Sequence, residues 1–496
     1  MARTALLGVD IGTSSSKGVL VSPSGEILAQ ATREHAPSRP APGHVEMDAT
    51  VWWDEFVQIT RELLDDSDVS VTAVGVSGMG PCVLLADEAN TPVRPAILYG
   101  VDTRATAQIA TLTERYGEAE ILERGGSALT TQAAGPKVAW VRENEPAVYE
   151  RARRLYMPSS WLAFQLTGAY VLDRHSASQC SPLFDRNSLD WHEPWWAEVA
   201  PGIEPPELVW PADVVGTVTE AAAAETGLPL GIPVVAGTID AWTEAVSVGA
   251  QNPGDLMLMY GTTMFLIATV PEPVATPSMW GTVGAFPGTS NLAGGMATSG
   301  AITGWLRELT GSADYPTLLA EAAEAGPGAH GLLMLPYFAG ERTPILDPDA
   351  RGIIAGLTLS HGRGDLYRAA LEATALGVRN NVEALVAAGA AIERIVAVGG
   401  GTQGSLWTQI VSDITGLPQV LPAQTVGASY GAAFLAATAV GEAAIDDWNP
   451  VATVVEPDET LRSTYDELYD LYVRLYQSTT DIAHSLADRQ RRAFSN

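Results

Sequence analysis

Gly8-Val9-Asp10-Ile11-Gly12-Thr13-Ser14-Ser15 carries a pattern that occurs twice in the chain. About half the chain length later, Leu258-Met259-Tyr260-Gly261-Thr262-Thr263 repeats it. In each copy an apolar strand runs into Gly-Thr-Ser or Gly-Thr-Thr and then into another apolar strand. This pattern is typical of a tight β-hairpin with a hydroxyl-bearing tip. We therefore predict two domains, each of which contributes one hairpin.

The rest of the chain predicts an α/β fold. A chain of 496 residues is longer than one hydrophobic core usually supports, so we expect one domain in residues 1–250, another in 251–496, and a cleft between them. Apolar strands alternate with helical patterns. The expected strands are Ala5–Val9, Gly18–Val21, Ala73–Val76, Val234–Ala236 and Ile395–Val398, and the expected helices are Thr50–Leu64, Ala221–Thr226, Asp365–Ala388, Leu406–Thr415 and a closing helix with Tyr465, Tyr469, Tyr472 and Tyr476. At their helical spacing, these tyrosines are interpreted as a packing face rather than a ligand platform.

Composition excludes several classes of function. The 58 acidic residues outnumber the 28 basic ones, and the net charge of −30 would repel a nucleic-acid backbone. Cys82 and Cys180 are too few for a disulfide framework, which fits a reducing compartment. The N-terminus reaches Asp10 before a signal-peptide core could form, and no apolar run is long enough to span a bilayer. We expect a cytoplasmic protein that binds neither nucleic acid nor membrane.

The two hairpin tips have the composition of a phosphate site. Amides exposed by glycine and the hydroxyls of serine and threonine can bind phosphate, and Lys17 adds a cation beside the first tip. The alternative is that Gly-Thr turns merely end strands. Because the pattern occurs twice, we favour phosphate binding. The Gly-x4-Gly-Lys-Ser/Thr loop is absent, so an ATP site in this chain belongs to another class.

A third glycine cluster, Gly399-Gly400-Gly401-Thr402-Gln403-Gly404, lies between an expected strand and an expected helix. It spells the Gly-x-Gly-x-x-Gly fingerprint of dinucleotide-binding proteins, but residues 419–424 offer no acid to hold a ribose. We interpret the cluster as a surface that a flat adenine or ribose can approach closely. Helix–strand packing is the competing explanation.

Two aspartates are candidates for the chemistry. Asp240 follows the expected strand Ile232–Ala236, and a base at a strand end could take the proton of an attacking hydroxyl. It could instead be the N-cap of a helix beginning at Ala241. Asp10 ends the first strand beside the phosphate hairpin, where a carboxylate would repel phosphate unless a Mg²⁺ ion lay between them. We therefore predict a metal-binding role for Asp10, through water.

These elements, in this order, resemble the FGGY carbohydrate kinases, particularly the xylulokinase-like branch. The resemblance covers nearly the whole chain. Its most specific stretch runs from Pro336 to Gly352 and contains Gly340-Glu341-Arg342-Thr343-Pro344. Supporting matches are Lys137–Pro146, Leu166-Thr-Gly168, Ser299-Gly300-Ala-Ile-Thr-Gly304 and Trp407-x-Gln409-x-x-x-Asp413. The resemblance implies two duplicated ribonuclease-H-like domains of the actin superfamily with a central cleft. It also implies an ATP-dependent kinase that phosphorylates a primary hydroxyl of a small sugar.

The resemblance also implies roles for single residues. Asp240 falls where the family has its catalytic base, and Mg²⁺ near Asp10 would neutralise developing charge. Closure of the domains would exclude water. The positions that match ATP-binding residues are Gly12, Thr13, Ser14, Ser15 and Lys17 in the first hairpin, Gly261, Thr262 and Thr263 in the second, and Gly300, Gly304, Gly400, Gly401 and Gly404 on the adenosine side.

The sequence indicates the identity of the sugar less clearly than the ATP-binding positions. The loop 77–82 reads Ser-Gly-Met-Gly-Pro-Cys where typical xylulokinases carry Gln-Met-His, so no histidine is available there. Asp102 and Arg104 keep an Asp-x-Arg pair, which either contacts the sugar or forms a structural ion pair. We expect the sugar site to contain Gly78, Met79, Asp102, Arg104 and Asp240. D-Xylulose is the favoured substrate, and ribulose, a tetrulose, a sugar acid and a polyol are alternatives.

Two other classes of function are weighed against the kinase. A non-catalytic actin-like nucleotide-binding protein would need the hairpins but neither Asp240 nor the Gly-Glu-Arg-Thr-Pro segment. A dehydrogenase that used Gly399–Gly404 would bind NAD and would not require Thr13 or Thr262. The oligomeric state does not follow from the sequence, and a homodimer is one alternative.

Overall fold

The structure, a computed structural model, describes residues 3–65, 69–441 and 443–494. Two compact units are present. The first comprises Met1–Gln251, Pro271–Asn291 and Gln424–Pro450, and the second comprises Asn252–Val270, Leu292–Ala423 and Val451–Asn496. The units therefore differ from the two continuous halves expected at 1–250 and 251–496, because segments of the C-terminal half fold with the N-terminal half. None of the described helices combines the length and the hydropathy needed to cross a bilayer.

The first unit is built on a mixed sheet with the order β13-β14-β5-β1-β2-β3, and β15 also pairs with β5. β1 pairs antiparallel with β2 and parallel with β5, so the first predicted hairpin forms the centre of the sheet. The strands are β1 (Arg3–Ile11), β2 (Ser15–Val21), β3 (Ile27–Glu34), β5 (Val69–Gly78), β13 (Val214–Thr217), β14 (Pro233–Val235) and β15 (Thr238–Ile239).

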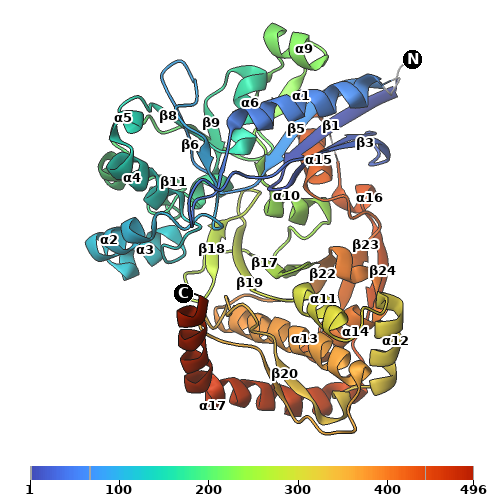
Figure 1. Cartoon of the computed structure of the whole chain (residues 1–496). Coiled ribbons are helices and arrows are strands. Elements are labelled where there is room, and N and C mark those ends of the chain that lie inside the picture. Colours follow the sequence, from blue (N-terminus) through green and yellow to red (C-terminus); the bar gives the residue numbers. More distant parts are fainter. Residues whose placement is uncertain (1–2, 66–68, 442, 495–496) are drawn as a thin grey trace. The chain divides into compact units, whose positions relative to one another are not determined.

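Helices cover both faces of this sheet. On one face, α1 (Ala49–Asp65) and α6 (Pro158–Thr167) contact the strands, and on the other face α15 (Ala428–Val440) contacts β1 and β5 and packs against α10 (Asp240–Ser247). Figure 1 shows α15, from the C-terminal part of the sequence, beside these N-terminal strands. The unit also contains β4 (Glu46–Met47), β6 (Leu84–Ala86), β7 (Ala96–Ile97), α2 (Thr106–Tyr116), α3 (Glu118–Gly125), α4 (Ala134–Asn144), α5 (Pro146–Tyr149), β8 (Arg154–Tyr156), β9 (Val171–Asp173), α7 (Arg174–Ser178), β10 (Phe184–Asp185), β11 (Asp190–Trp191), α8 (Glu193–Val199), β12 (Glu207–Val209), α9 (Glu220–Thr226), β18 (Trp280–Val283) and α16 (Ile445–Trp448).

Successive residues of β1 point to opposite faces of the sheet, and this alternation places the site. Val9 belongs to the core beneath α1, whereas Leu6 belongs to the core that contains α15. Gly8 lies on the α15 side, where a Cβ atom would be 2.0 Å from the carbonyl oxygen of Ser429. Glycine at this position therefore lets α15 lie against the strand. Asp10 is the next residue that points to this same side.

The second unit repeats the plan of the first. Its strands follow the order β19-β17-β16-β22-β23-β24, and β16 pairs antiparallel with β17 and parallel with β22, as β1 does with β2 and β5. The predicted duplicated α/β architecture is therefore confirmed. The elements are β16 (Asp255–Tyr260), β17 (Met264–Val270), β19 (Ser290–Met296), α11 (Gly300–Leu309), α12 (Tyr315–Ala325), β20 (Leu333–Leu335), β21 (Ile353–Ala355), α13 (Arg363–Ala387), β22 (Arg394–Val398), α14 (Ser405–Thr415), β23 (Gln419–Pro422), β24 (Val451–Val455) and α17 (Arg462–Phe494), with 3₁₀ turns at Ala329–Gly331, Gly400–Gln403 and Glu459–Leu461.

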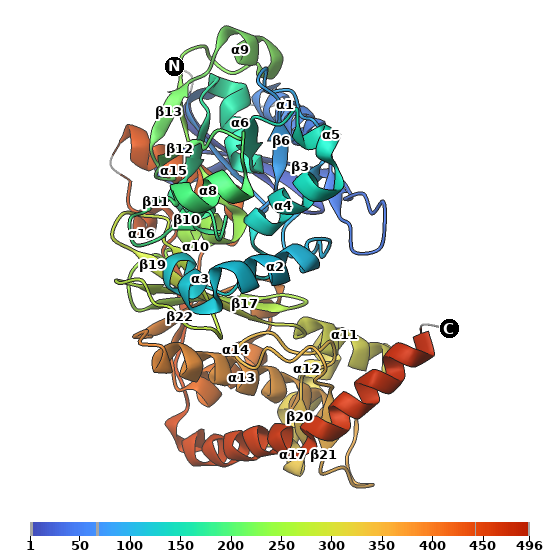
Figure 2. The ribbon, with the colours of Figure 1, turned by 90° about the vertical axis from the view of Figure 1, so that its left-hand side faces the viewer.

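The long closing helix α17 belongs to the second unit (Figure 2). Tyr465, Tyr469 and Tyr472 are buried, and Tyr472 accepts a hydrogen bond from Tyr337 at 2.7 Å. The interpretation of the tyrosine stripe as a packing face is therefore confirmed.

Candidate active site

The carboxyl ends of three neighbouring strands of the first unit meet at one edge of the sheet. Asp10 of β1 lies opposite Ser77 of β5, and Ser77 lies opposite Thr238 of β15. Asp240 follows β15 directly as the first residue of α10. Two aspartates that are far apart in the sequence are thus brought to the same strand ends, where α/β folds place their ligands.

The turn before β15 sets the position of Asp240. Gly237 has a φ of +67°, and a Cβ atom there would lie 1.8 Å from the carbonyl oxygen of Val76, so only glycine fits. Ile239, not Asp240, is the N-cap of α10. Asp240 Oδ1 accepts one hydrogen bond, from the amide of Ala241 at 2.7 Å, and its side chain is half-buried. The carboxylate is therefore held at the helix start but does not have the N-cap role that the sequence left open.

Three carboxylates interact at this edge, and they cannot all be ionised without cost. Burial, and then the charge of Asp240, raise the pKa of Asp10 to about 8. Burial raises the pKa of Asp240 to about 6, and burial together with Asp240 raises the pKa of Glu244 to about 7. Lys17, which lies opposite Asp10 in the hairpin, favours the ionised forms of Asp10 and Glu244. One lysine faces three acids, so a further cation would stabilise the site.

Asp10 has the properties of a ligand for such a cation. Its Oδ1 atom is buried and has no hydrogen-bond partner in the protein. Within residues 3–65, 69–441 and 443–494, no three His, Cys, Asp or Glu side chains converge on a point that could hold a metal ion. Mg²⁺ does not need such a cage, because it usually keeps several waters and takes one or two carboxylates together with phosphate oxygens. The residues present therefore fit a Mg²⁺ ion held near Asp10.

Both hairpin tips present hydroxyl groups. In the first tip the Gly12 amide donates to the carbonyl oxygen of Ser15 at 3.0 Å, and in the second the Gly261 amide donates to that of Thr263 at 3.1 Å. The two glycine amides therefore close the turns. Ser14 and Thr262 are exposed at the tips. The side chains and remaining amides of these turns are the groups that can reach a phosphate.

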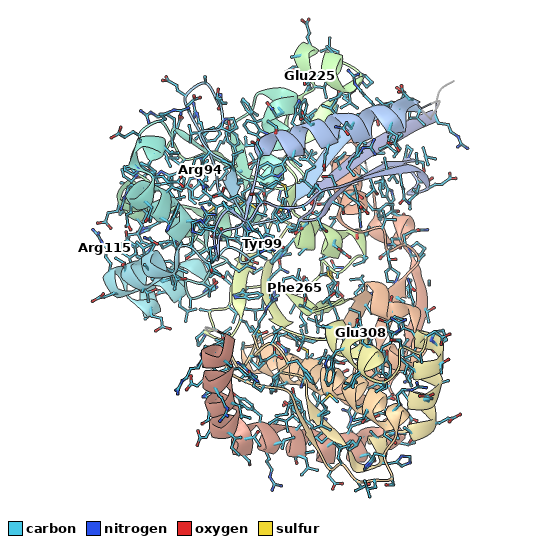
Figure 3. All side chains as sticks on the ribbon, in the orientation of Figure 1. Arg94, Tyr99, Arg115, Glu225, Phe265 and Glu308 are labelled. Atoms are coloured by element: carbon cyan, nitrogen blue, oxygen red, sulfur yellow. The ribbon has the colours of Figure 1, made fainter. Side chains whose placement is uncertain are left out.

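The first tip also contacts the loop that follows β7. The Thr13 hydroxyl and the Tyr99 hydroxyl lie 2.9 Å apart and share a hydrogen bond, and Figure 3 labels Tyr99. In the neighbouring part of this loop, the Gly100 amide donates to Gln132 Oε1 at 2.7 Å. The predicted phosphate hairpin and the predicted sugar loop are therefore linked within the first unit.

The glycines predicted on the adenosine side fall into two groups. A Cβ atom on Gly300 would lie 2.6 Å from the carbonyl oxygen of Gly261, and the Gly300 amide donates to that oxygen. A Cβ atom on Gly401 would lie 2.8 Å from the Trp407 ring. Packing therefore explains why Gly300 and Gly401 are glycines, and for Gly401 this agrees with the packing alternative stated for the Gly399–Gly404 cluster.

Gly304, Gly400 and Gly404 are less confined. A Cβ atom on Gly400 would meet nothing within 4 Å, and one on Gly304 would come no closer than 4.0 Å to the Tyr315 hydroxyl. A Cβ atom on Gly404 would lie 3.1 Å from the Leu319 side chain. Gly304 and Gly400 are thus the positions in this set that leave open surface for a ligand. Residues Gly400–Gln403 form a 3₁₀ turn before α14.

Asp102 and Arg104 form the structural ion pair that the sequence left as one alternative. Both side chains have no exposed surface, and Arg104 Nη2 donates to Asp102 Oδ2 at 2.7 Å. Asp102 also accepts from the Val45 amide at 2.6 Å, and Arg104 also binds Glu46 at 2.7 Å. The pair therefore holds the loop after β7 against β4 and leaves little capacity for a sugar.

Gly78 and Met79 are packed into the interior. Met79 is 1% exposed, and its amide donates to the carbonyl oxygen of Ile11 at 2.8 Å. A Cβ atom on Gly78 would lie 2.6 Å from Pro158. These two residues join the end of β5 to the end of β1, and so fix the strand ends on which the site stands.

The Gly-Glu-Arg-Thr-Pro segment supports the second unit from within. Glu341 is 6% exposed and accepts from the amides of Ala297 and Arg342 at 2.8 and 2.7 Å. The Thr343 hydroxyl accepts from the Gly295 amide and donates to Asn381, each at 2.7 Å. The segment therefore holds the end of β19, which leads into α11.

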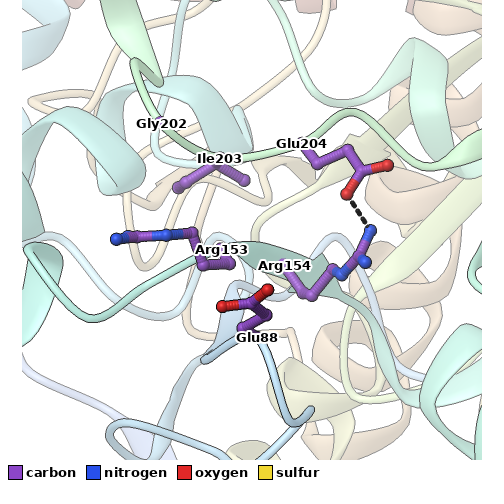
Figure 4. Close-up of a pocket in the computed structure, with 6 residues that line it drawn as sticks. All are labelled: Glu88, Arg153, Arg154, Gly202, Ile203 and Glu204. Carbon is purple, nitrogen blue, oxygen red and sulfur yellow. Dashed lines mark hydrogen bonds and ion pairs between the residues drawn. The ribbon is translucent and has the colours of Figure 1, made fainter.

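The first unit also contains a hollow of about 430 Å³ (Figure 4). Its lining comprises Glu88, Arg153, Arg154, Gly202, Ile203 and Glu204. Arg154 pairs with Glu204, and Arg153 donates to the carbonyl oxygens of Glu150 and Ala152. None of the predicted site residues lines the hollow, and the charge of Arg154 is already paired with Glu204.

Two residues that interact with the predicted site, Glu244 and Tyr99, were not predicted from the sequence. Glu244 lies one helical turn after Asp240, and this i, i+4 spacing on α10 could have revealed that both acids share a face. Tyr99 had no such signal, because its contact with Thr13 joins residues that are far apart in the sequence.

Comparison with known proteins gives a consistent result. Residues 5–247 match the model of the N-terminal domain of the FGGY family of carbohydrate kinases, and residues 256–440 match its C-terminal domain. A xylulose kinase of Escherichia coli (strain K12) is 29% identical over 490 residues, which cover 95% of this chain and 98% of that protein. The crystal structure of a xylulose kinase from Rhodospirillum rubrum shares 34% identity and a TM-score of 0.91 over 97% of this chain and all of that one. A glycerol kinase of Nocardia farcinica is 31% identical over 466 residues, which cover 88% of this chain and 91% of that protein.

Proposed function

The chain belongs to the FGGY family of carbohydrate kinases, within its xylulokinase-like branch, and we propose that it is a D-xylulose kinase. In the proposed reaction it transfers the γ-phosphoryl group of ATP to a primary hydroxyl of this sugar. The observation that carries the reaction type is the position of Asp240 at the strand ends beside Asp10. The choice of sugar is supported by the xylulose kinases among the relatives.

In this proposal Asp240 is the general base. Its carboxylate accepts the proton of the primary hydroxyl as that oxygen attacks the γ-phosphorus, and the bond to the β,γ-bridging oxygen breaks. Asp240 is half-buried, so it can reach a substrate, and its raised pKa matches the task of accepting a proton near neutral pH. Asp10 would hold Mg²⁺, and when bound this ion would supply charge neutralisation for the phosphates.

The nucleotide contacts are assigned to the predicted groups of each unit taken by itself. Thr13, Ser14, Ser15 and Lys17 of the first hairpin can bind phosphate through hydroxyls, amides and the lysine charge, and Thr262 and Thr263 of the second hairpin offer hydroxyls and amides of the same kind. Gly304, Gly400 and Gly404 line the site for the adenosine. Gly12, Gly261, Gly300 and Gly401 shape the backbone around these groups. Asp102 and Arg104 support the sugar loop as a buried pair.

The proposal is tested by a coupled assay of ADP release with Mg-ATP. The panel comprises D-xylulose, ribulose, a tetrulose, a sugar acid and glycerol, and glycerol is included because of the glycerol kinase relative. We expect D-xylulose to give the highest kcat/KM. If another compound gives a higher kcat/KM, that compound and not D-xylulose is the preferred substrate. If none of the compounds increases the rate of ADP release, the proposal is contradicted.

The activity should depend on pH through Asp240. A general base works only when ionised, and burial raises the pKa of Asp240 to about 6. We therefore expect kcat/KM for the sugar to fall about tenfold per pH unit below about pH 6 and to level off above it. The measurement is the rate at saturating Mg-ATP between pH 4.5 and 8, with circular dichroism to verify folding at each pH. A flat profile in a folded protein would exclude Asp240 as the base.

A further inference from the structure

A histidine outside the predicted site touches the first phosphate hairpin. His35 follows β3, and its side chain is 8% exposed. Its Nε2 atom lies 2.9 Å from the carbonyl oxygen of Gly12, and its amide donates to the carbonyl oxygen of Ser14 at 3.0 Å. One residue therefore binds the hairpin tip through both its backbone and its side chain.

The partners of the ring determine where its protons lie. A carbonyl oxygen only accepts hydrogen bonds, so Nε2 carries a proton and donates it to Gly12. The other ring nitrogen, Nδ1, lies 2.9 Å from Glu55 Oε2, on the neighbouring helix α1, and the Glu55 side chain is 12% exposed. The hydrogen bond between His35 Nδ1 and Glu55 Oε2 fixes the orientation of the ring.

The tip is held from two directions. His35 binds the backbone at Gly12 and Ser14, and Tyr99 binds the side chain of Thr13. The bond from His35 also directs the Gly12 carbonyl oxygen toward the imidazole, and a carbonyl oxygen turned toward a phosphate would repel it. A loop that is ordered before binding loses less conformational entropy when its ligand arrives.

We propose that His35, oriented by Glu55, is a positioning residue that presets the first hairpin for the phosphates of ATP. The inference rests on the proposed function, because it takes the phosphate ligand from there. In this inference His35 and Glu55 increase the affinity for the nucleotide. They affect neither sugar binding nor the proton transfer.

The test replaces the donor at nearly constant volume. In His35→Leu the bond to Gly12 is lost, and we expect the Kd for the β,γ-imido analogue of ATP with Mg²⁺ to rise about tenfold, equivalent to about 1.4 kcal/mol. KM for ATP should rise in parallel, and KM for the sugar should stay within about twofold. His35→Gln can place an amide N–H near the position of Nε2, so it should restore the Kd to within about threefold.

A matched control comes from the same helix. Glu62 on α1 pairs with Arg33 at the surface, so Glu62→Gln should leave the Kd unchanged, whereas Glu55→Gln should weaken binding. Calorimetric binding without sugar separates this inference from the choice of substrate. If the wild type binds the nucleotide and folded His35→Leu binds equally well, or if His35→Leu raises both KM values alike, the positioning role is overturned. If the wild type does not bind the nucleotide, the proposed function and this inference fall together.

Discussion

Replacing Asp240 by asparagine should lower kcat about 1,000-fold while KM for ATP stays within about threefold. Asparagine keeps the shape of the side chain and can still accept from the Ala241 amide, so α10 should begin at the same residue. What it loses is the ability to take a proton at neutral pH. The measurement is steady-state kinetics with Mg-ATP and the preferred sugar, together with calorimetric nucleotide binding.

The control for this variant is Asp54→Asn. Asp54 is exposed on α1, on the opposite face of the sheet from α10, so the same chemical change there should leave kcat within about twofold. A loss of kcat below about tenfold in Asp240→Asn would show that another group accepts the proton. Glu244, whose pKa is raised to about 7 by burial and by Asp240, would be the next candidate.

Gly75→Ala should lower the free energy of unfolding by about 3 kcal/mol or more. Gly75 lies in β5, and a Cβ atom there would be 1.8 Å from the carbonyl oxygen of Ala432 in α15. The colliding atom belongs to a helix backbone, so it cannot move aside as a flexible side chain would. The helix as a whole would have to retreat from β1 and β5. Urea unfolding followed by circular dichroism measures the change.

Gly441→Ala is the matched control for this prediction. Gly441 follows α15, its φ is −170°, and a Cβ atom there would come no closer than 4.0 Å to its nearest neighbour. Alanine should therefore change the stability by less than about 0.5 kcal/mol. If Gly75→Ala were equally mild, α15 would not pack against β5 as described.

The sequence predicted those features that depend on local pattern. The two hairpins, the five strands and the five helices are confirmed, because alternating apolar strands and Gly-Thr turns are local signals. Asp10 and Asp240 could be placed together because parallel strands end at the same edge of a sheet.

Other features depend on contacts between distant segments. α15 is almost uniformly apolar, so its periodicity gives no information about which sheet it covers, and the glycines at 8 and 75 that accept it lie in another part of the chain. Whether a glycine faces open space or a neighbouring side chain, as at Gly400 and Gly401 respectively, is likewise decided by tertiary packing. The sequence left open whether Asp102 and Arg104 contact the sugar or pair with each other, because the burial of both side chains depends on tertiary packing.

The most direct test of the central claim is ³¹P NMR of a reaction with D-xylulose and Mg-ATP, run with the wild type and Asp240→Asn side by side. We expect the wild type to form a phosphate monoester on the primary hydroxyl in equal amount to ADP, and the variant to form about 1,000-fold less in the same time. ADP with free phosphate and no sugar phosphate, or equal product from both proteins, would contradict it.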